Sequence, residues 1–581
     1  MKFRLLLLTI LAFITALMAF KLKKPFTNPA AVSAQNKPDK KYIVRCGPDW
    51  AALTDWLEDA DIPPIPGAGI YKWKISTKND SAQFYFNQGI NMYYSFHIIE
   101  AMASFKKAAK FDPSCAMLYW AQALTYGPNI NDFGYTASYN AYLAAGRAIE
   151  SCGACTEKEQ MLISAQRSRY TGDSTEDRQA LNQVYADQMK EVYDKFPNDP
   201  DVAALYADAM MLQHPWDLWT VDGTPKEWTP QIRKVLEKLL AKAPMHPGAN
   251  HYYIHVMEAS PYAAKALPSA ERLGKTNLGL SHVVHMPSHI YLRTGLYQKG
   301  VDVNIKAVNS YKKSIPLFPA VTGADILYII HNLHMKTNNA MLEGNYKIAE
   351  AAALETRKSI VADYLLAPAP LGNLVQYVYM TPVLVYVRFG KWNELLKEPA
   401  PDASQEYSNI LYHFGRGMAF ANLSKIEEAN KELGELKNLI MNDTTLVIAL
   451  TPFSPPIDGA NIASKLLSGT IAMKEKKISD AIIDFAEATY VEQNMVYDEP
   501  RDWLLSPKHF LGSAYLADGD GFNAEKTFKA DLKTNNENGW ALYGLYKALS
   551  LQNKPGETAS ALSRYKKAFS NADVKLTGPV F

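Results

Sequence analysis

The sequence predicts an all-α protein whose helices pair and stack into a curved superhelix, an α-solenoid. Segments of about 12–18 residues place apolar residues at the period of an α-helix, and Pro, Gly and Asn separate the segments. No convincing run of alternating apolar and polar residues indicates a β-sheet. With 581 residues, of which 48% are hydrophobic, the chain is long enough for more than one folding unit.

Small and large residues follow a fixed spacing in several of these segments. Between residues 81 and about 113, Ala101, Phe105 and Ala108 place small, large and small side chains along one helix. This is the spacing of the 34-residue tetratricopeptide repeat (TPR), in which small residues let antiparallel helices approach. The predicted fold is therefore a TPR-like helical-repeat superhelix. Because no repeat has a core of its own, we expect the following residues to be buried: Ala101, Phe105, Ala108, Trp120, Phe485, Phe528 and Trp540.

The first 34 residues have the order of a secretory signal. Lys2 and Arg4 precede an apolar run over residues 5–20. Sixteen residues of helix span roughly 24 Å, which is shorter than the roughly 30 Å core of a bilayer. We therefore expect a signal peptide in residues 1–34 and an exported, periplasmic protein. Because the basic residue Lys21 directly follows the run, an N-terminal membrane anchor is the alternative.

Three further segments follow the signal. Pro63, Pro64 and Pro66 exclude a long helix, so we expect residues 35–80 to form an extended lead-in. We expect the TPR-like repeats to divide into an N-terminal and central part and a C-terminal part: 81–350, with a His-rich region at 214–334, and 351–581.

The charge of the chain is nearly balanced. The sequence has 61 Lys and Arg residues against 59 Asp and Glu residues, a formal net charge of +2. No basic face stands out, so nucleic acid is not an expected partner. Solenoids present extended concave surfaces, and we therefore expect a protein or peptide partner in the cell envelope.

Histidines gather in the centre of the chain. Nine of the twelve lie between residues 214 and 334. His251, His255 and Glu258 have the spacing i, i+4 and i+7, which places all three on one face of a helix. Two imidazoles and a carboxylate suit a divalent transition metal such as Zn or Fe(II). Tyr252 stands where a thermolysin-type helix has a Glu, so a standard metalloprotease is not predicted.

Two more groups of histidines lie downstream. His285 and His289, with His282 nearby, surround a predicted helix start at Pro287. In the repeats, corresponding helices line one concave surface, so we expect these side chains to converge with those of His251 and His255. A polar pocket without metal and purely structural histidines are the alternatives. His331 and His334, spaced i and i+3, complete the candidate metal ligands.

An aromatic segment precedes the histidines. Trp216, Asp217 and Trp219, with Tyr252, are the candidate residues of a pocket for a carbohydrate or another small molecule. The alternative is that these aromatic side chains only fill gaps between helices. No nucleophile, phosphate-loop or dinucleotide motif is present in the sequence.

Cys152 and Cys155 form a C-x-x-C motif. In an exported chain this spacing fits a short structural disulfide. It also fits a thiol redox pair or half of a zinc site, although no strand-then-helix pattern of a thioredoxin-like domain surrounds it.

Several stretches together resemble a family of exported bacterial proteins described as tetratricopeptide-repeat proteins. The resemblance covers nearly the whole chain after the signal. It implies a helical-repeat fold and a His-rich centre, and it implies no activity. One departure is that residues 70–75 contain no histidine, where family members often have one. The stretches that carry the resemblance are 86–89, 115–120, 127–131, 214–219, 246–251, 285–291, 331–334 and 538–540.

These observations lead to two functional hypotheses. The repeats favour a binding or scaffold module in the cell envelope. The central histidines favour a metal-binding protein or metalloenzyme, and the sequence leaves open whether the protein is an enzyme.

Overall fold

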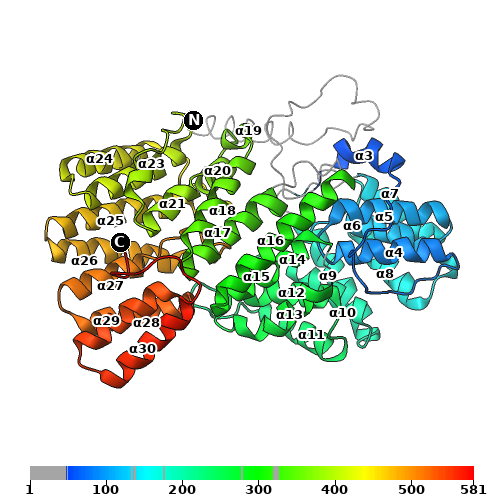
Figure 1. The fold of residues 1–581 in the computed structure, drawn as a ribbon. Coiled ribbons are helices and arrows are strands. Elements are labelled where there is room, and N and C mark those ends of the chain that lie inside the picture. Colours follow the sequence, from blue (N-terminus) through cyan, green and yellow to red (C-terminus); the bar gives the residue numbers. More distant parts are fainter. Residues whose placement is uncertain are drawn as a thin grey trace, which may run out of the picture.

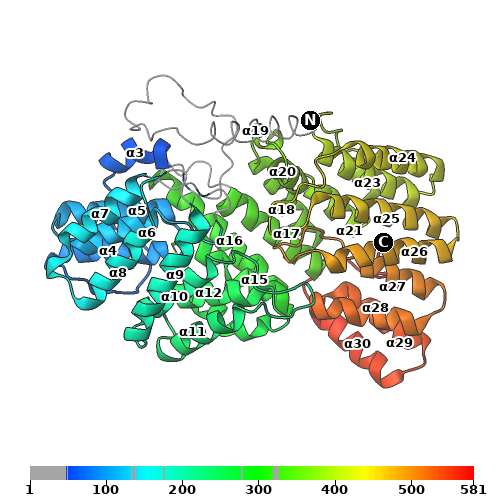
Figure 2. The same cartoon turned by 180° about the vertical axis from the view of Figure 1, so that it is seen from behind.

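The computed structural model describes residues 48, 50–131, 135, 139–173, 177–276, 279–317 and 326–581. Throughout this part of the chain, successive helices pack against one another, and there is no β-strand beyond one isolated bridge between Trp219 and Pro225. Figure 1 shows the helices as one continuous array running from N-terminal to C-terminal units, and Figure 2 shows the same array from behind. The predicted all-α helical-repeat solenoid is confirmed.

The first half of the array reaches from the lead-in to the centre of the molecule. Its helices are α3 (Trp50–Asp59), α4 (Asp80–Tyr93), α5 (Ile98–Phe111), α6 (Ala116–Thr125), α7 (Tyr139–Ser151), η2 (Cys152–Ala154), α8 (Glu157–Ser168), α9 (Arg178–Lys195), α10 (Pro200–Met211), α11 (Thr229–Lys242), α12 (Pro247–Glu258), η3 (Ala263–Ala266), α13 (Leu267–Thr276), α14 (Ser281–His285), α15 (Pro287–Thr294), α16 (Tyr297–Ser314) and η4 (Ile315–Leu317).

The second half continues from the centre to the C-terminal units. Its helices are η6 (Ile326–Ile330), α17 (His331–Glu343), α18 (Tyr346–Ser359), α19 (Ala362–Leu365), α20 (Leu371–Tyr379), α21 (Thr381–Arg388), α22 (Trp392–Leu395), α23 (Glu406–Asn422), α24 (Ile426–Asn442), α25 (Pro456–Lys474), α26 (Ile478–Asn494), α27 (Pro507–Ala517), α28 (Gly521–Thr534), α29 (Gly539–Leu551) and α30 (Pro555–Ala568).

The helices pack through the small and large residues that the sequence indicated. In the α4–α5 pair, Gly89 lies against the Phe105 ring so closely that a Cβ there would be 2.5 Å from it. In the C-terminal units, the Phe528 ring lies between Gly512 of α27 and Gly544 of α29. The predicted burial is confirmed, because all seven residues are at most 2% exposed: Ala101, Phe105, Ala108, Trp120, Phe485, Phe528 and Trp540.

The lead-in differs from the prediction at one place. The predicted extended segment 35–80 contains the helix α3, ten residues long. Trp50, Leu53 and Leu57 recur at the helical period and are buried against the first core. The chain after α3 is extended up to α4, as the three prolines require.

The C-terminal units curve back onto the centre of the molecule. Trp540 Nε1 in α29 donates to the carbonyl oxygen of Met341 in α17 at 2.8 Å. Arg293 Nη1 in α15 donates to the carbonyl oxygen of Thr534 at 3.1 Å. Trp540 and Met341 belong to one C-terminal hydrophobic core, built mainly from residues after 329. Arg293 instead lies on α15, whose residues Ile290 and Tyr291 belong to an N-terminal core built mainly from residues before 312.

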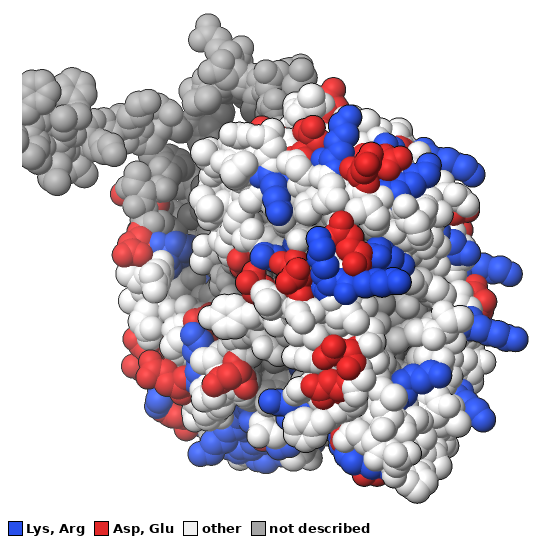
Figure 3. Space-filling view, turned by 90° about the vertical axis from the view of Figure 1, so that its left-hand side faces the viewer, with Lys and Arg blue, Asp and Glu red and all other residues white. Residues whose placement is uncertain are grey.

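The surface in Figure 3 shows Lys and Arg side chains interspersed with Asp and Glu on that face. Among the described residues, no helix combines the length and the apolar character that crossing a membrane requires. The predicted signal or anchor in residues 1–34 lies outside the described residues.

Replacing the Phe528 side chain tests the packing between small and large residues. We expect Phe528→Ala to lower the free energy of unfolding by about 3–5 kcal/mol, because the deletion leaves a cavity between α27 and α29. Urea unfolding followed by circular dichroism measures the change. The matched control is Phe522→Ala in the same helix, where the ring is 67% exposed, and we expect a change of less than about 1 kcal/mol. Equal effects of the two substitutions would contradict this packing.

Candidate metal centre

Helix α12 presents the first two histidines of the centre. It begins at its N-cap His246, whose Nδ1 accepts the backbone N–H of Ala249 at 3.0 Å, and Pro247 occupies the first turn. His251 and His255 follow one helical turn apart, so both rings lie on the same side of α12. The helical face predicted from the i, i+4 spacing is confirmed.

Helices α14 and α15 present the next three histidines. His282 and His285 lie in the short helix α14, and Met286 separates it from α15, which begins at Pro287. The predicted helix start at Pro287 is therefore confirmed. His289 lies inside α15, and its ring contacts those of His255 in α12 and His285 in α14.

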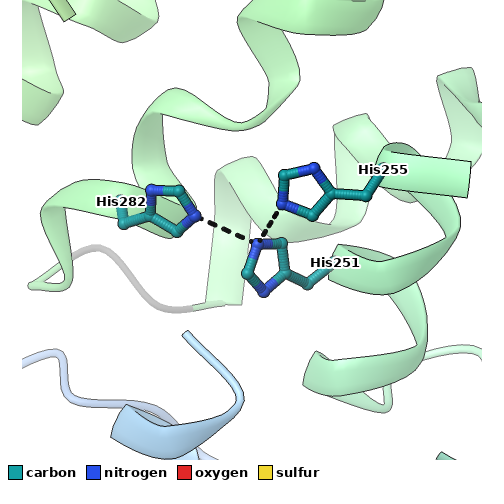
Figure 4. A group of neighbouring side chains, drawn as sticks. All are labelled: His251, His255 and His282. Carbon is teal, nitrogen blue, oxygen red and sulfur yellow. Dashed lines mark hydrogen bonds between the residues drawn. The ribbon is translucent and has the colours of Figure 1, made fainter. Parts of the chain in front are cut away.

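The first histidine triad consists of His251, His255 and His282. Figure 4 shows the His251 ring between the other two. His251 Nε2 lies 3.1 Å from His255 Nε2 and 3.2 Å from His282 Nε2. All three side chains are buried, with exposures of 0%, 5% and 2%. Three imidazole nitrogens therefore meet at one point away from water.

Outer hydrogen bonds fix which nitrogens of this triad point inward. His251 Nδ1 lies 2.7 Å from the carbonyl oxygen of Tyr94. His255 Nδ1 lies 3.0 Å from Glu258 Oε1. A carbonyl and a carboxylate can only accept hydrogen bonds, so both Nδ1 atoms carry hydrogen. In the neutral rings, both Nε2 atoms then direct lone pairs toward each other.

A metal ion satisfies this arrangement better than one hydrogen bond does. His282 can donate one hydrogen from Nε2 to His251 Nε2, and the lone pair of His255 Nε2 then faces an occupied acceptor. Three ligands around one Zn²⁺ lie roughly 3.3 Å apart, given bonds of about 2.0–2.1 Å. The observed separations of 3.1 and 3.2 Å are close to that value. Orientation of metal-binding histidines by a carbonyl or carboxylate on the outer nitrogen is usual in metal sites.

The second histidine triad consists of His285, His289 and His331, the first residue of α17. Its three ligand atoms lie within 4.8 Å of one another. His285 Nε2 is 2.9 Å from His289 Nε2, and the His331 ring centroid is 4.7 Å from that of His285. His285 Nδ1 lies 3.3 Å from Asn304 Oδ1, which holds the ring from the outer side.

The Glu258 carboxylate connects the two triads. Its Oε1 pairs with His255 Nδ1 at 3.0 Å, and its Oε2 lies 2.9 Å from His289 Nδ1. Glu499 Oε2 also pairs with His289 Nδ1. Glu258, predicted as a metal ligand, thus contacts the outer nitrogens of one histidine from each triad. With His289 and Glu499 it forms a third group of potential ligand atoms within 4.8 Å of one another.

Burial and mutual interaction set the charges of the cluster. Burial raises the pKa of Glu258, but His255 and His289 outweigh it and hold the pKa at about 2. Burial opposes protonation of His289, but Glu499 and Glu258 raise its pKa to about 10.

The remaining rings of the cluster are mostly neutral. Burial, followed by neighbouring imidazoles, holds the pKa values of His251, His282 and His285 well below the usual range. The same causes lower the pKa of His331 to about 3. Neutral imidazole is the form that binds metal ions.

A cavity of about 230 Å³ lies beside the two triads. The histidine helices form one of its sides, and segments of the C-terminal half form the others. His334 of α17 lies on its lining, with its ring centroid 6.0 Å from that of Tyr377. The predicted convergence of the histidines on one inner surface is confirmed, because the following residues line this cavity: His255, His282, His285, His289, His331 and His334.

Three carboxyl groups from the segment before α27 also line the cavity. Burial raises the pKa values of Asp498 and Glu499 to about 6, and it raises that of Asp502 well above the usual range. A side-chain hydrogen bond joins Asp498 to Asp502, so the two carboxyl groups share a proton.

Of the four residues predicted for an aromatic pocket, only one lines the cavity. Trp216 lines it, and Trp216 Nε1 donates to Asn131 Oδ1 at 3.0 Å. Asp217 instead pairs with Lys226 at the surface, at 3.0 Å. Trp219 Nε1 donates to the carbonyl oxygen of Val256 at 2.7 Å, and Tyr252 is fully buried in the N-terminal core. Trp219 and Tyr252 therefore fill the space between helices.

The C-x-x-C motif lies far along the array from the cavity. Cys152 and Cys155 are free thiols, and Cys152 Sγ donates to the carbonyl oxygen of Ile149 at 3.0 Å. The disulfide between the two cysteines stays a prediction.

Some residues of the centre were not predicted as site residues. His282 was recognised only as a neighbour of the other histidines, although it completes the first triad. Glu499, with Asp498 and Asp502, lies more than 160 positions after His334, and only the acidic run before Pro500 could have indicated these carboxyls.

His97 is held by structural contacts next to the first triad. Its Nδ1 lies 3.0 Å from Glu100 Oε1, and its Nε2 accepts the backbone N–H of His282 at 3.3 Å. Both ring nitrogens are therefore used, and His97 supports the backbone of α14.

No protein-family model matches the chain, and no curated protein matches it in sequence. Similar solved structures include human IFIT1 as a dimer with m7Gppp-AAAA, at 13% identity, over 86% of this chain and 92% of that chain, with a TM-score of 0.29. The Cut9–Hcn1 hetero-tetramer of the APC/C shares 13% identity over 85% and 78%, with a TM-score of 0.27. Yeast Tom70 shares 10% identity over 84% and 96%, with a TM-score of 0.29. These scores are too low to carry an argument about function.

The fold and the site together define the class of protein. It is a TPR-like helical-repeat protein with a buried histidine centre, and both features follow from its own residues.

Replacing Glu258 tests its position between the triads. We expect Glu258→Gln to lower the free energy of unfolding of the metal-free protein by about 3 kcal/mol, because one partner of a buried ion pair is removed. Chemical denaturation in the presence of a chelator measures the change. Glu237→Gln is the control, since the Glu237 side chain is 44% exposed, and we expect a loss below about 1 kcal/mol. A loss no larger than that of the control would show that the Glu258 contacts do not hold the centre together.

Proposed function

We propose that this protein binds transition-metal ions at its buried histidine centre. The observation that carries the proposal is the meeting of His251 Nε2 and His255 Nε2 at 3.1 Å, while both Nδ1 atoms donate outward. Two inward lone pairs at this distance repel each other unless a proton or a metal cation lies between them, and His282 supplies a third nitrogen for a metal. Three imidazoles suit Zn²⁺, Fe²⁺ or Cu²⁺, and three protein ligands leave a fourth position open.

The second triad supports a site for a further ion. His289 Nε2 faces His285 Nε2, and its Nδ1 faces two carboxylates. This is the arrangement of carboxylate, histidine and metal seen in many metal sites. The ring centroids of His255 and His289 are 6.1 Å apart, so the two ions would be neighbours.

The binding or scaffold role in the cell envelope remains a second candidate. It rests on the helical-repeat fold, a class of structure that presents large concave surfaces to protein and peptide partners. Export, the envelope location and the identity of any partner stay predictions from the sequence.

Metal content is the decisive measurement for the first proposal. We expect the purified protein, after supplementation with Zn²⁺, Fe²⁺ or Cu²⁺ and removal of free ions, to retain about one equivalent or more. Elemental analysis should show that His251→Ala and His255→Gln each lose most of this metal, with circular dichroism confirming that the variants fold. The control is His413→Ala, which removes a partly exposed histidine paired with Glu432, and its metal content should equal that of the natural protein. Less than about a tenth of an equivalent in the natural protein would refute the proposal.

Trp216 offers an optical test of where the metal binds. Its ring centroid is 5.5 Å from that of His255. We expect Cu²⁺ added to metal-free protein to quench the fluorescence of Trp216. The chain has 10 Trp residues, so the signal of Trp216 is obtained by subtracting the spectra of Trp216→Phe. Equal quenching of the natural protein and of this variant would place the metal elsewhere.

A further inference from the structure

The cavity beside the triads has an unusual charge. Among the described residues that line it, Asp498, Glu499 and Asp502 are acidic, and none is Lys or Arg. His289 forms an ion pair with Glu499, and Arg293 and Arg501 also lie close enough to Glu499 and Asp502 to offset part of this charge. The lining itself presents carboxyl oxygens and no Lys or Arg, so it favours an occupant with several hydrogen-bond donors.

Several polar atoms on the cavity lining have no hydrogen-bond partner. They are Nε2 of His334, Oε1 of Glu499 and Oδ2 of Asp502. His334 and Glu499 are only 4% and 5% exposed. A buried polar atom without a partner destabilises the folded protein. Both oxygens accept hydrogen bonds, and the free oxygen of a carboxyl pair that shares a proton does so as well, so a group with several N–H donors would satisfy them.

The rest of the lining is apolar and aromatic. Leu371, Leu374 and Val378 from α20 and Phe453 contribute apolar surface, and the Tyr377 ring lies near His334. Aromatic faces attract organic cations. A bare metal ion would leave this apolar surface unused, whereas an organic molecule would cover it.

We propose that this cavity binds a small organic amine. Its ammonium group would contact Asp498, Glu499 and Asp502, and its short apolar body would pack against Leu374, Val378 and Phe453. The ammonium group has three donors and no acceptor, which matches the unpartnered oxygens. A volume of about 230 Å³ equals that of about eight water molecules in the liquid, so the ligand has roughly eight non-hydrogen atoms. This proposal is independent of metal binding at the triads.

Calorimetric titration of metal-free protein tests the proposal with three probes of the same length. They are hexylamine, hexanol and hexanoate. Metal-free protein is used because an amine can also coordinate a metal ion. We expect hexylamine to bind at least about tenfold more tightly than hexanol, a difference of about 1.4 kcal/mol. We expect no binding of hexanoate.

Two variants of the carboxyl groups and one control variant show whether these groups recognise the amine. Asp502→Asn keeps the shape and removes one of the two carboxyl groups that share a proton, and we expect it to weaken hexylamine binding at least about tenfold. Asp480→Asn changes an exposed acid of α26 and should leave binding unchanged. The double variant Asp498→Asn, Asp502→Asn is measured as well, because the carboxyl group of Asp498 remains in the single variant.

Three results would overturn the proposal. They are no binding of hexylamine, equal binding of hexylamine and hexanol, and binding that survives in a folded double variant. Because elemental analysis tests metal binding separately, failure of one proposal is distinguishable from failure of the other.

Discussion

The histidine centre depends on the buried carboxylate of Glu258. Glu258 is the last residue of α12, where the carbonyl end of the helix disfavours negative charge. A buried carboxylate at such a position needs close partners, and it has them in His255 and His289. These two contacts fix the end of α12 relative to α15, and they turn one ring of each triad so that its other nitrogen points inward. One side chain therefore orients one ring of each triad, while Tyr94 and Asn304 hold His251 and His285 from their outer sides.

The solenoid supplies the setting for this interaction. Because the C-terminal units curve back and contact α15 and α17, residues far apart in the sequence share one cavity. The N-terminal core provides imidazoles, and the C-terminal half provides Glu499 and its acidic neighbours. The centre thus lies where two hydrophobic cores meet, a common location for binding sites. Either core alone would contain only part of it.

The sequence predicted the fold and part of the centre, for different physical reasons. Repeat packing is local: Phe105 and Phe528 pack against glycines of adjacent helices, so spacing alone indicates it. The pairing of His251 with His255 follows from helix geometry in the same way. The contact of Glu499 with His289 depends on the curvature of the whole superhelix, which no local pattern encodes. Tyr252 and Trp219 were predicted to line a pocket, but both lie between helices. The prediction failed because aromatic composition does not reveal which side of a helix faces the core.

The burial of the first triad affects how long an ion stays bound there rather than how tightly it binds. The side chains of the first triad are at most 5% exposed, whereas His331 of the second triad is half-buried and lines the cavity beside them. An ion held between the nitrogens of the first triad could leave only when one of its rings or helices moves. Collective helix motions take microseconds to milliseconds, far longer than the side-chain motions that free a ligand from an open groove. The residence time of such an ion is thus governed by the packing of α12 and α14, which lies outside the site itself.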